Sequence, residues 1–232
     1  MSRPTVTYAT FCCPKDRERA LENVQAHAAS HGYPFDEKIM VFQRCEPSPV
    51  EGFFVDIIGE QDYGHILADV GVKYPDPVLD ELTHGWGAPH FWAHHMVNHI
   101  SASRFLKVHG TDYLVFADAD CYVKDQPAGT SWINLGIQIL ESDPSVFVVS
   151  PSDGRPNPGK DRMMSQQMFL INRKRFLEME YIPWDGKFID GGPFREFYAL
   201  LEGFVFRYMQ KHNLYRYLLP KEISRWWHLE WH

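Results

Sequence analysis

Residues 113–123 read Tyr113-Leu114-Val115-Phe116-Ala117-Asp118-Ala119-Asp120-Cys121-Tyr122-Val123, an apolar run that ends in two carboxylates one residue apart. The run before Asp118 is too short for a helix, and Gly110 lies just before it. This pattern is typical of a buried central strand that delivers acids to the edge of a sheet. Asp118 and Asp120, two apart on an extended segment, are expected to project to the same side.

Two carboxylates on one side of a strand end are suited to a divalent cation. Hard oxygen ligands favour Mg²⁺ or Mn²⁺. Such an ion would neutralise a diphosphate that leaves from a sugar. A simple turn, in which aspartate is common, is the alternative interpretation. The strand before Asp118 and the Cys121-Tyr122-Val123 segment after Asp120 favour the metal site.

In this setting the chain resembles the glycosyltransferases of the GT-A fold, whose Asp-x-Asp motif follows a mid-chain strand as Asp118-Ala119-Asp120 does here. The segment Pro89-His90-Phe91-Trp92-Ala93 before the motif is also similar to galactosyl- and xylosyltransferases that modify polysaccharides. The resemblance implies a single α/β domain with a central, mostly parallel sheet flanked by helices. It implies a Rossmann-like, nucleotide-sugar-binding half over residues 1–123 and an acceptor-binding half over residues 124–232.

The resemblance also implies roles for residues near the C-terminus. In GT-A enzymes an acidic residue near the start of a late helix faces the acceptor or the reacting carbon; Asp190 matches this place and Glu196 is its competitor. A helix cap is the alternative role of Asp190. A C-terminal histidine often completes the metal site of this fold, a role for His228 or His232, and imidazole tilts the choice from Mg²⁺ toward Mn²⁺. The donor would be a UDP- or GDP-sugar, and the acceptor a glycan or glycolipid.

The first quarter of the chain alternates strand and helix. We expect a strand over residues 5–11, a helix over 16–30 with Asp16 as N-cap, and strands over 38–44 and 53–58. Short joins between such elements predict a parallel pair with a right-handed crossover. Further on, the sequence predicts helices over residues 89–108, 131–141 and 194–212, and strands over residues 146–150 and 167–172.

In parallel sheets, ligands gather at the carboxyl ends of the strands. Arg104, on the helix expected over residues 89–108, is a candidate to reach a phosphate, and a solvated arginine is the simpler interpretation. For each single residue an ordinary loop role is the alternative. The residues that we expect near the nucleotide are Thr10, Phe11, Cys12, Gln43, Arg44, Asp118 and Ala119.

The same expected helix carries four histidines in two pairs, His90/His94 and His95/His99, each with a four-residue spacing. This spacing puts two imidazoles on one helix face and raises the alternative of a zinc hydrolase. The glutamate base of the His-Glu-x-x-His pattern is absent, which favours surface or capping histidines.

Length, composition and charge agree with one catalytic domain. The chain has 232 residues, 44% hydrophobic and 15% aromatic, enough to bury a sizeable core. A net charge of −7 argues against binding to nucleic acid. Four cysteines show neither zinc-ligand spacing nor a disulfide framework, so a reducing compartment is the simpler expectation. Without a signal sequence or a run of about 18 apolar residues, a cytoplasmic location is expected, and membrane association is not indicated.

Three other functions fit part of the pattern. A haloacid-dehalogenase-like phosphatase also has Asp-x-Asp after a strand, but its usual Gly-Thr continuation is replaced by Cys121-Tyr122. A sugar nucleotidyltransferase would have a Gly-rich, basic loop after Phe11, which is missing. A non-catalytic carbohydrate-binding domain would keep the aromatic residues without needing a metal. The prediction is therefore a metal-dependent glycosyltransferase that transfers sugar from a nucleotide diphosphate donor to a hydroxyl group.

Overall fold

The structure is a computed structural model of the chain, and it describes residues 3–14, 16–43, 45–58, 110–124, 126–127, 129–152, 158–162, 167–179 and 201–228. It begins with β1 (Val6–Cys12), α1 (Arg17–Ser30) and β2 (Glu37–Gln43). Every residue of β1 is buried, and β1 pairs in parallel with β2. The predicted strand–helix–strand unit is therefore confirmed: the helix ends at Ser30 as expected, and the other boundaries are displaced by one residue.

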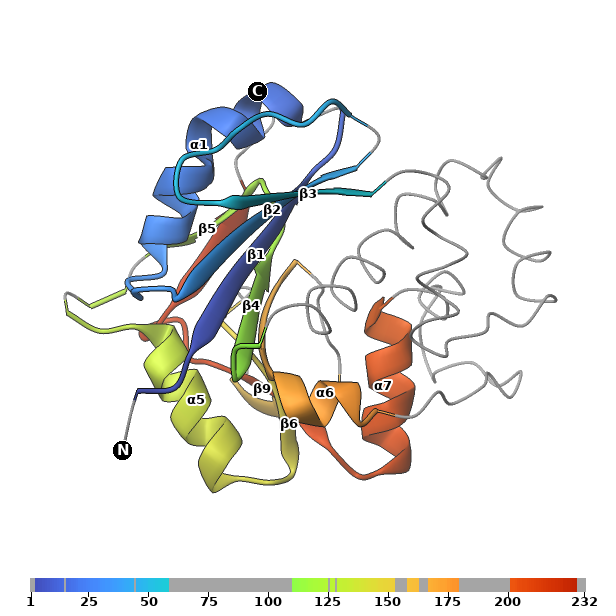
Figure 1. Cartoon of the computed structure of the whole chain (residues 1–232). Coiled ribbons are helices and arrows are strands. Elements are labelled where there is room, and N and C mark those ends of the chain that lie inside the picture. Colours follow the sequence, from blue (N-terminus) through green and yellow to red (C-terminus); the bar gives the residue numbers. More distant parts are fainter. Residues whose placement is uncertain are drawn as a thin grey trace, which may run out of the picture.

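One eight-stranded sheet has the order β3-β2-β1-β4-β8-β6-β9-β7 (Figure 1). Its first four strands are parallel to one another, and β9 is parallel to β6. β8 runs antiparallel to both β4 and β6, and β7 antiparallel to β9. The sheet is therefore mixed. The remaining strands are β3 (Phe54–Ile58), β4 (Tyr113–Ala117), β6 (Val146–Ser150), β7 (Gly159–Asp161), β8 (Met168–Asn172) and β9 (Tyr215–Leu218).

Helices cover both faces of the sheet. Figure 1 shows α1 and α5 (Trp132–Ser142) on one side, and α6 (Arg173–Leu177) and α7 (Leu201–Lys211) on the other. Successive strand residues alternate between the two sides, as a period of two requires. On the side of α6 and α7, Phe116 of β4 lies between two other phenylalanines, with ring centroids 5.2 Å from Phe11 and 5.2 Å from Phe169.

Helix α5 lies close against the sheet because it has a glycine at the contact. Ser131 caps its N-terminus by accepting a hydrogen bond from the Ile133 amide (3.3 Å). A Cβ atom on Gly136 would stand 2.6 Å from Cδ2 of Leu170 on β8, nearer than real Cβ atoms approach. The cap and the glycine therefore fix both the start of the helix and its distance from the sheet.

A separate two-stranded ribbon pairs β5 (Cys121–Lys124) with β10 (Arg225–His228) in antiparallel register. Sequence analysis expected neither strand, since each has only four residues. The ribbon brings the end of the described chain back beside the Asp-x-Asp segment.

Some expectations need correction or lie outside the described residues. Asp16 does occupy the N-cap of α1, but its side chain makes no capping bond; its Oδ2 accepts a hydrogen bond from Sγ of Cys13 (2.9 Å) instead. The helix expected over residues 194–212 is described as α7 from Leu201 to Lys211. The helix expected over residues 89–108, with its histidines, lies outside the described residues. Among the helices that are described, none has the length and apolar character required to span a membrane.

Candidate metal and donor site

The two aspartates lie on a tight turn between β4 and β5. The amide of Cys121 donates to the carbonyl of Asp118 (2.9 Å), which closes a four-residue turn. The amide of Asp118 donates to the carbonyl of Gln167 (2.8 Å), just before β8. The prediction of an extended segment is therefore wrong, because the chain turns between β4 and β5. The turn still places the two aspartates close together, so a turn and a metal site are compatible at this position.

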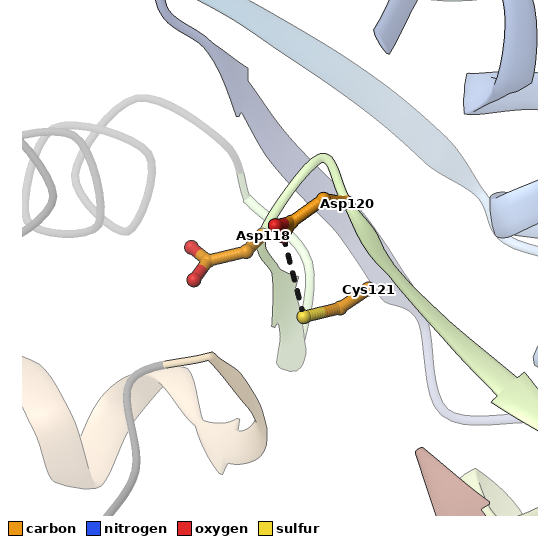
Figure 2. A group of neighbouring side chains, drawn as sticks. All are labelled: Asp118, Asp120 and Cys121. Atoms are coloured by element: carbon orange, nitrogen blue, oxygen red, sulfur yellow. Dashed lines mark hydrogen bonds between the residues drawn. The ribbon is translucent and has the colours of Figure 1, made fainter. Parts of the chain in front are cut away.

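The turn brings three side chains that could bind a metal into one small cluster (Figure 2). Ligand atoms of Asp118, Asp120 and Cys121 all lie within 4.8 Å of one another. Sγ of Cys121 donates to Oδ1 of Asp120 (3.6 Å). Opposite ligands of one Mg²⁺ or Mn²⁺ stand about 4.2 Å apart, so small side-chain rotations would let both carboxylates bind one ion. The donor set fits a hard divalent cation, with one softer thiol beside it.

Cys121 is fully buried and next to both acids. Burial, and then the negative charges of Asp118 and Asp120, raise the pKa of its thiol well above the usual value. At neutral pH it is therefore a neutral S–H donor toward Asp120. Sequence analysis treated Cys121 only as a neighbour of the motif, although its place directly after Asp120 was visible.

The cluster lies at a point where a parallel sheet is expected to bind ligands. The connection from β1 leads through α1 to β2 on one side, while β4 pairs with β1 on the other. Between two such strands, outside their carboxyl ends, open α/β sheets form a binding crevice. Thr10 and Cys12 near the end of β1, Gln43 at the end of β2 and Asp118 after β4 all belong to this edge.

Several residues predicted near the donor are buried. Thr10 is fully buried, and Gln43 is 2% exposed. Phe11 is 6% exposed and packs in the core on the side of α6 and α7. Ala119, in the middle of the motif, packs in one cluster with Ala20 and Val24 of α1.

His27 of α1 is a neighbour of the motif that sequence analysis missed. Its side chain is 4% exposed, and its ring stacks on Tyr122 with centroids 5.9 Å apart and planes at 18°. Burial lowers its pKa, while the Ala119 carbonyl and the Asp120 carboxylate both act in the opposite direction. No local pattern could have indicated His27, because it lies about ninety positions before the turn.

The ribbon places the C-terminal segment beside the motif. In the backbone register of β10 with β5, His228 lies opposite Cys121, and Arg225 lies opposite Lys124. The guanidinium of Arg225 stacks on the ring of Trp227 at 3.9 Å, so this segment is packed rather than frayed. Five predicted site residues lie outside the described residues: Arg44, Arg104, Asp190, Glu196 and His232.

No protein-family model and no curated protein sequence matches the chain. Solved structures do match it. The mannosyltransferase PcManGT from Pyrobaculum calidifontis, in complex with GDP-Man and Mn²⁺, matches with a TM-score of 0.53 and 14% identity over 97% of this chain and 57% of that chain. A197 from STIV matches with a TM-score of 0.45 and 13% identity over 97% of this chain and 86% of that one. TarS 1–349 from S. aureus matches with a TM-score of 0.46 and 10% identity over 95% of this chain and 60% of that chain.

The chain thus spans little more than half the length of the mannosyltransferase. At such identities the likeness concerns the fold and not the activity. With the strand order and the flanking helices above, it confirms the predicted fold class: the chain has an α/β, GT-A-like fold built on one large central sheet.

Proposed function

We propose that the protein is a glycosyltransferase that transfers sugar from a nucleotide diphosphate donor to a hydroxyl acceptor. The observation that carries the proposal is the convergence of Asp118 and Asp120, with ligand atoms within 4.8 Å, at the end of a parallel strand beside β1. The structure with the similar fold holds GDP-Man and Mn²⁺, which supports the same class of donor and metal here.

The chain's own residues would divide the work between the two ends of the donor. Asp118 and Asp120 would hold Mn²⁺, or Mg²⁺, and His228 or His232 would supply a further ligand. The backbone register supports His228, which lies opposite Cys121. When bound, such an ion neutralises charge on the departing diphosphate. Residues at the carboxyl ends of β1 and β2 would shape the wall of the nucleotide pocket.

Asp190, or else Glu196, would act at the acceptor or the anomeric carbon. A carboxylate there would accept the proton of the attacking hydroxyl if the configuration is inverted, or stabilise positive charge at the carbon if it is retained. The acceptor would be a glycan or a glycolipid.

The test combines metal binding with turnover in wild type and Asp120→Asn. Mn²⁺ affinity is measured by electron paramagnetic resonance, and release of UDP or GDP is followed with a panel of UDP- and GDP-sugars. We expect wild type to bind Mn²⁺ and hydrolyse or transfer at least one donor. The variant should lose on the order of 100-fold in Mn²⁺ affinity, because one carboxylate ligand becomes a weaker amide. Equal Mn²⁺ binding by both proteins would overturn the assignment of the site.

The same purified proteins also distinguish a phosphatase from a glycosyltransferase. A haloacid-dehalogenase-like enzyme would use Asp118 as nucleophile and hydrolyse a phosphomonoester without a sugar donor. Hydrolysis of p-nitrophenyl phosphate that is abolished by Asp118→Asn would favour it over glycosyl transfer.

A further inference from the structure

The turn that carries the two acids is supported from one side by helix α1. His27, in the last turns of α1, is buried and stacks on Tyr122, the second residue of β5. The Ala119 carbonyl and the Asp120 carboxylate also act on its imidazole, since both raise its pKa against the effect of burial. One side chain is therefore packed between α1 and the segment that follows Asp118.

Neighbouring residues of α1 hold the segments on both sides of this contact. The Ser30 hydroxyl accepts a hydrogen bond from the Val123 amide (3.0 Å) and donates to the His27 carbonyl (2.6 Å). Ala119 packs with Ala20 and Val24 on the same face of the helix. The end of α1 and the start of β5 are thus one packed unit, and His27 lies at its centre.

The physical need for such support comes from the two carboxylates. Like charges within 4.8 Å repel one another, and a turn that is free to open would separate them. Groups that orient metal ligands from behind typically contribute 10-fold to 100-fold to metal affinity. A ring that is buried between the helix and the turn is a rigid support of this kind.

We propose that His27 is a positioning residue, which holds the Asp118–Cys121 turn in the conformation where both carboxylates can bind one cation. The effect of His27 on metal binding rests on the proposed function. Its support of the turn does not. His27 contacts the turn and not the donor, so its effect reaches the metal only through Asp118 and Asp120.

The experiment compares His27→Ala, His27→Gln and a control of similar stability cost, Leu140→Ala. Leu140 is 5% exposed on α5, the helix that packs on β6 and β8. Two quantities are measured in each protein: Mn²⁺ affinity by electron paramagnetic resonance, and hydrogen exchange of the Cys121 amide without metal, which reports the hydrogen bond to Asp118. Thermal unfolding confirms that each variant is folded at the working temperature.

We expect His27→Ala to weaken Mn²⁺ binding about 10-fold and to speed exchange of the Cys121 amide. His27→Gln should recover part of both, because its amide can still donate to the Ala119 carbonyl. Leu140→Ala should change neither. The inference would be overturned if the Cys121 amide of His27→Ala exchanged at the wild-type rate. Equal changes of Mn²⁺ affinity and exchange rate in Leu140→Ala would also overturn it. If wild type binds no Mn²⁺, the proposed function fails, and the exchange measurement alone still decides whether His27 holds the turn.

Discussion

The two halves of the sheet use charged side chains in opposite ways. In the far half (β8, β6, β9 and β7), Arg216 is fully buried and meets Asp161, directly opposite it on β7, through Nε–Oδ1 (3.0 Å) and Nη2–Oδ2 (2.5 Å) contacts. In the N-terminal half (β3, β2, β1 and β4), the turn after β4 instead brings Asp118 and Asp120 together. The first arrangement pairs opposite charges and stabilises the fold. The second gathers like charges and lowers stability, as is common at functional sites.

The largest effect on stability is expected when the far pair is broken. Asp161→Asn should lower the free energy of unfolding by about 3 kcal/mol, because it removes the carboxylate that balances a buried guanidinium. Urea unfolding measures this. Lys174→Met, at an exposed pair with Glu178 (3.9 Å), is the control and should cost no more than about 0.5 kcal/mol. Mn²⁺ affinity should stay at the wild-type value in both variants. A lower Mn²⁺ affinity in Asp161→Asn would show that the two halves of the sheet are not independent.

A smaller loss of stability is expected from a substitution where α5 packs on the far half of the sheet. Gly136→Ala should cost about 2 kcal/mol, because the new Cβ would stand 2.6 Å from Leu170 and force a shift. Gly110→Ala is a matched control, since a Cβ there has no heavy atom within 4 Å. Chemical denaturation of the two variants compares them directly. Equal stability would mean that the helix moves away from the sheet at little cost.

Next in size is the pH dependence of stability that comes from His31, in the N-terminal half. Burial, and then the neighbouring His27, lower the pKa of His31 from 6.5 to about 3. As the pH falls below the unfolded value, the unfolded chain binds a proton that the folded chain does not, so stability falls. Between about pH 7 and about pH 5.5 the loss from this group should be about 1.2 kcal/mol.

His31→Gln tests this assignment by removing the titrating group while keeping an acceptor for the Trp132 indole, which donates to Nδ1 of His31 (3.1 Å). The slope of unfolding free energy against pH should become shallower in this variant. An unchanged slope in His31→Gln would assign the pH dependence to other groups.

The smallest effect has the opposite sign. Asp118→Asn should raise the free energy of unfolding by about 0.5 to 1 kcal/mol without metal, because it removes the repulsion from Asp120. Thermal unfolding at low ionic strength should show the gain, and added salt should reduce it. Mn²⁺ binding should be lost in the same variant. A destabilised Asp118→Asn protein would show that the carboxylate supports the turn rather than strains it.

Much of the N-terminal half was predictable because its signals are local. The strand at residues 113–117 was expected where β4 is found, since its five apolar residues end at an acid. Helix α1 and its flanking strands followed from turn formers and alternation. The motif itself was also visible, but its backbone was not. The same three residues fit an extended strand and a turn. Contacts with distant residues distinguish the two, such as the hydrogen bond from the Asp118 amide to the Gln167 carbonyl.

The sequence by itself determined the elements whose signals lie within ten or fifteen residues: the buried strands of the first quarter, helices α1 and α5, and the two acids at a strand end. Only the tertiary structure decided the order of the strands, the return of β10 to β5 and the place of His27 beside Ala119 and Tyr122. The physical reason is that propensities and caps act between neighbours along the chain. Contacts across a hundred residues are chosen by which surfaces bury apolar area together, a quantity that no short window of sequence contains.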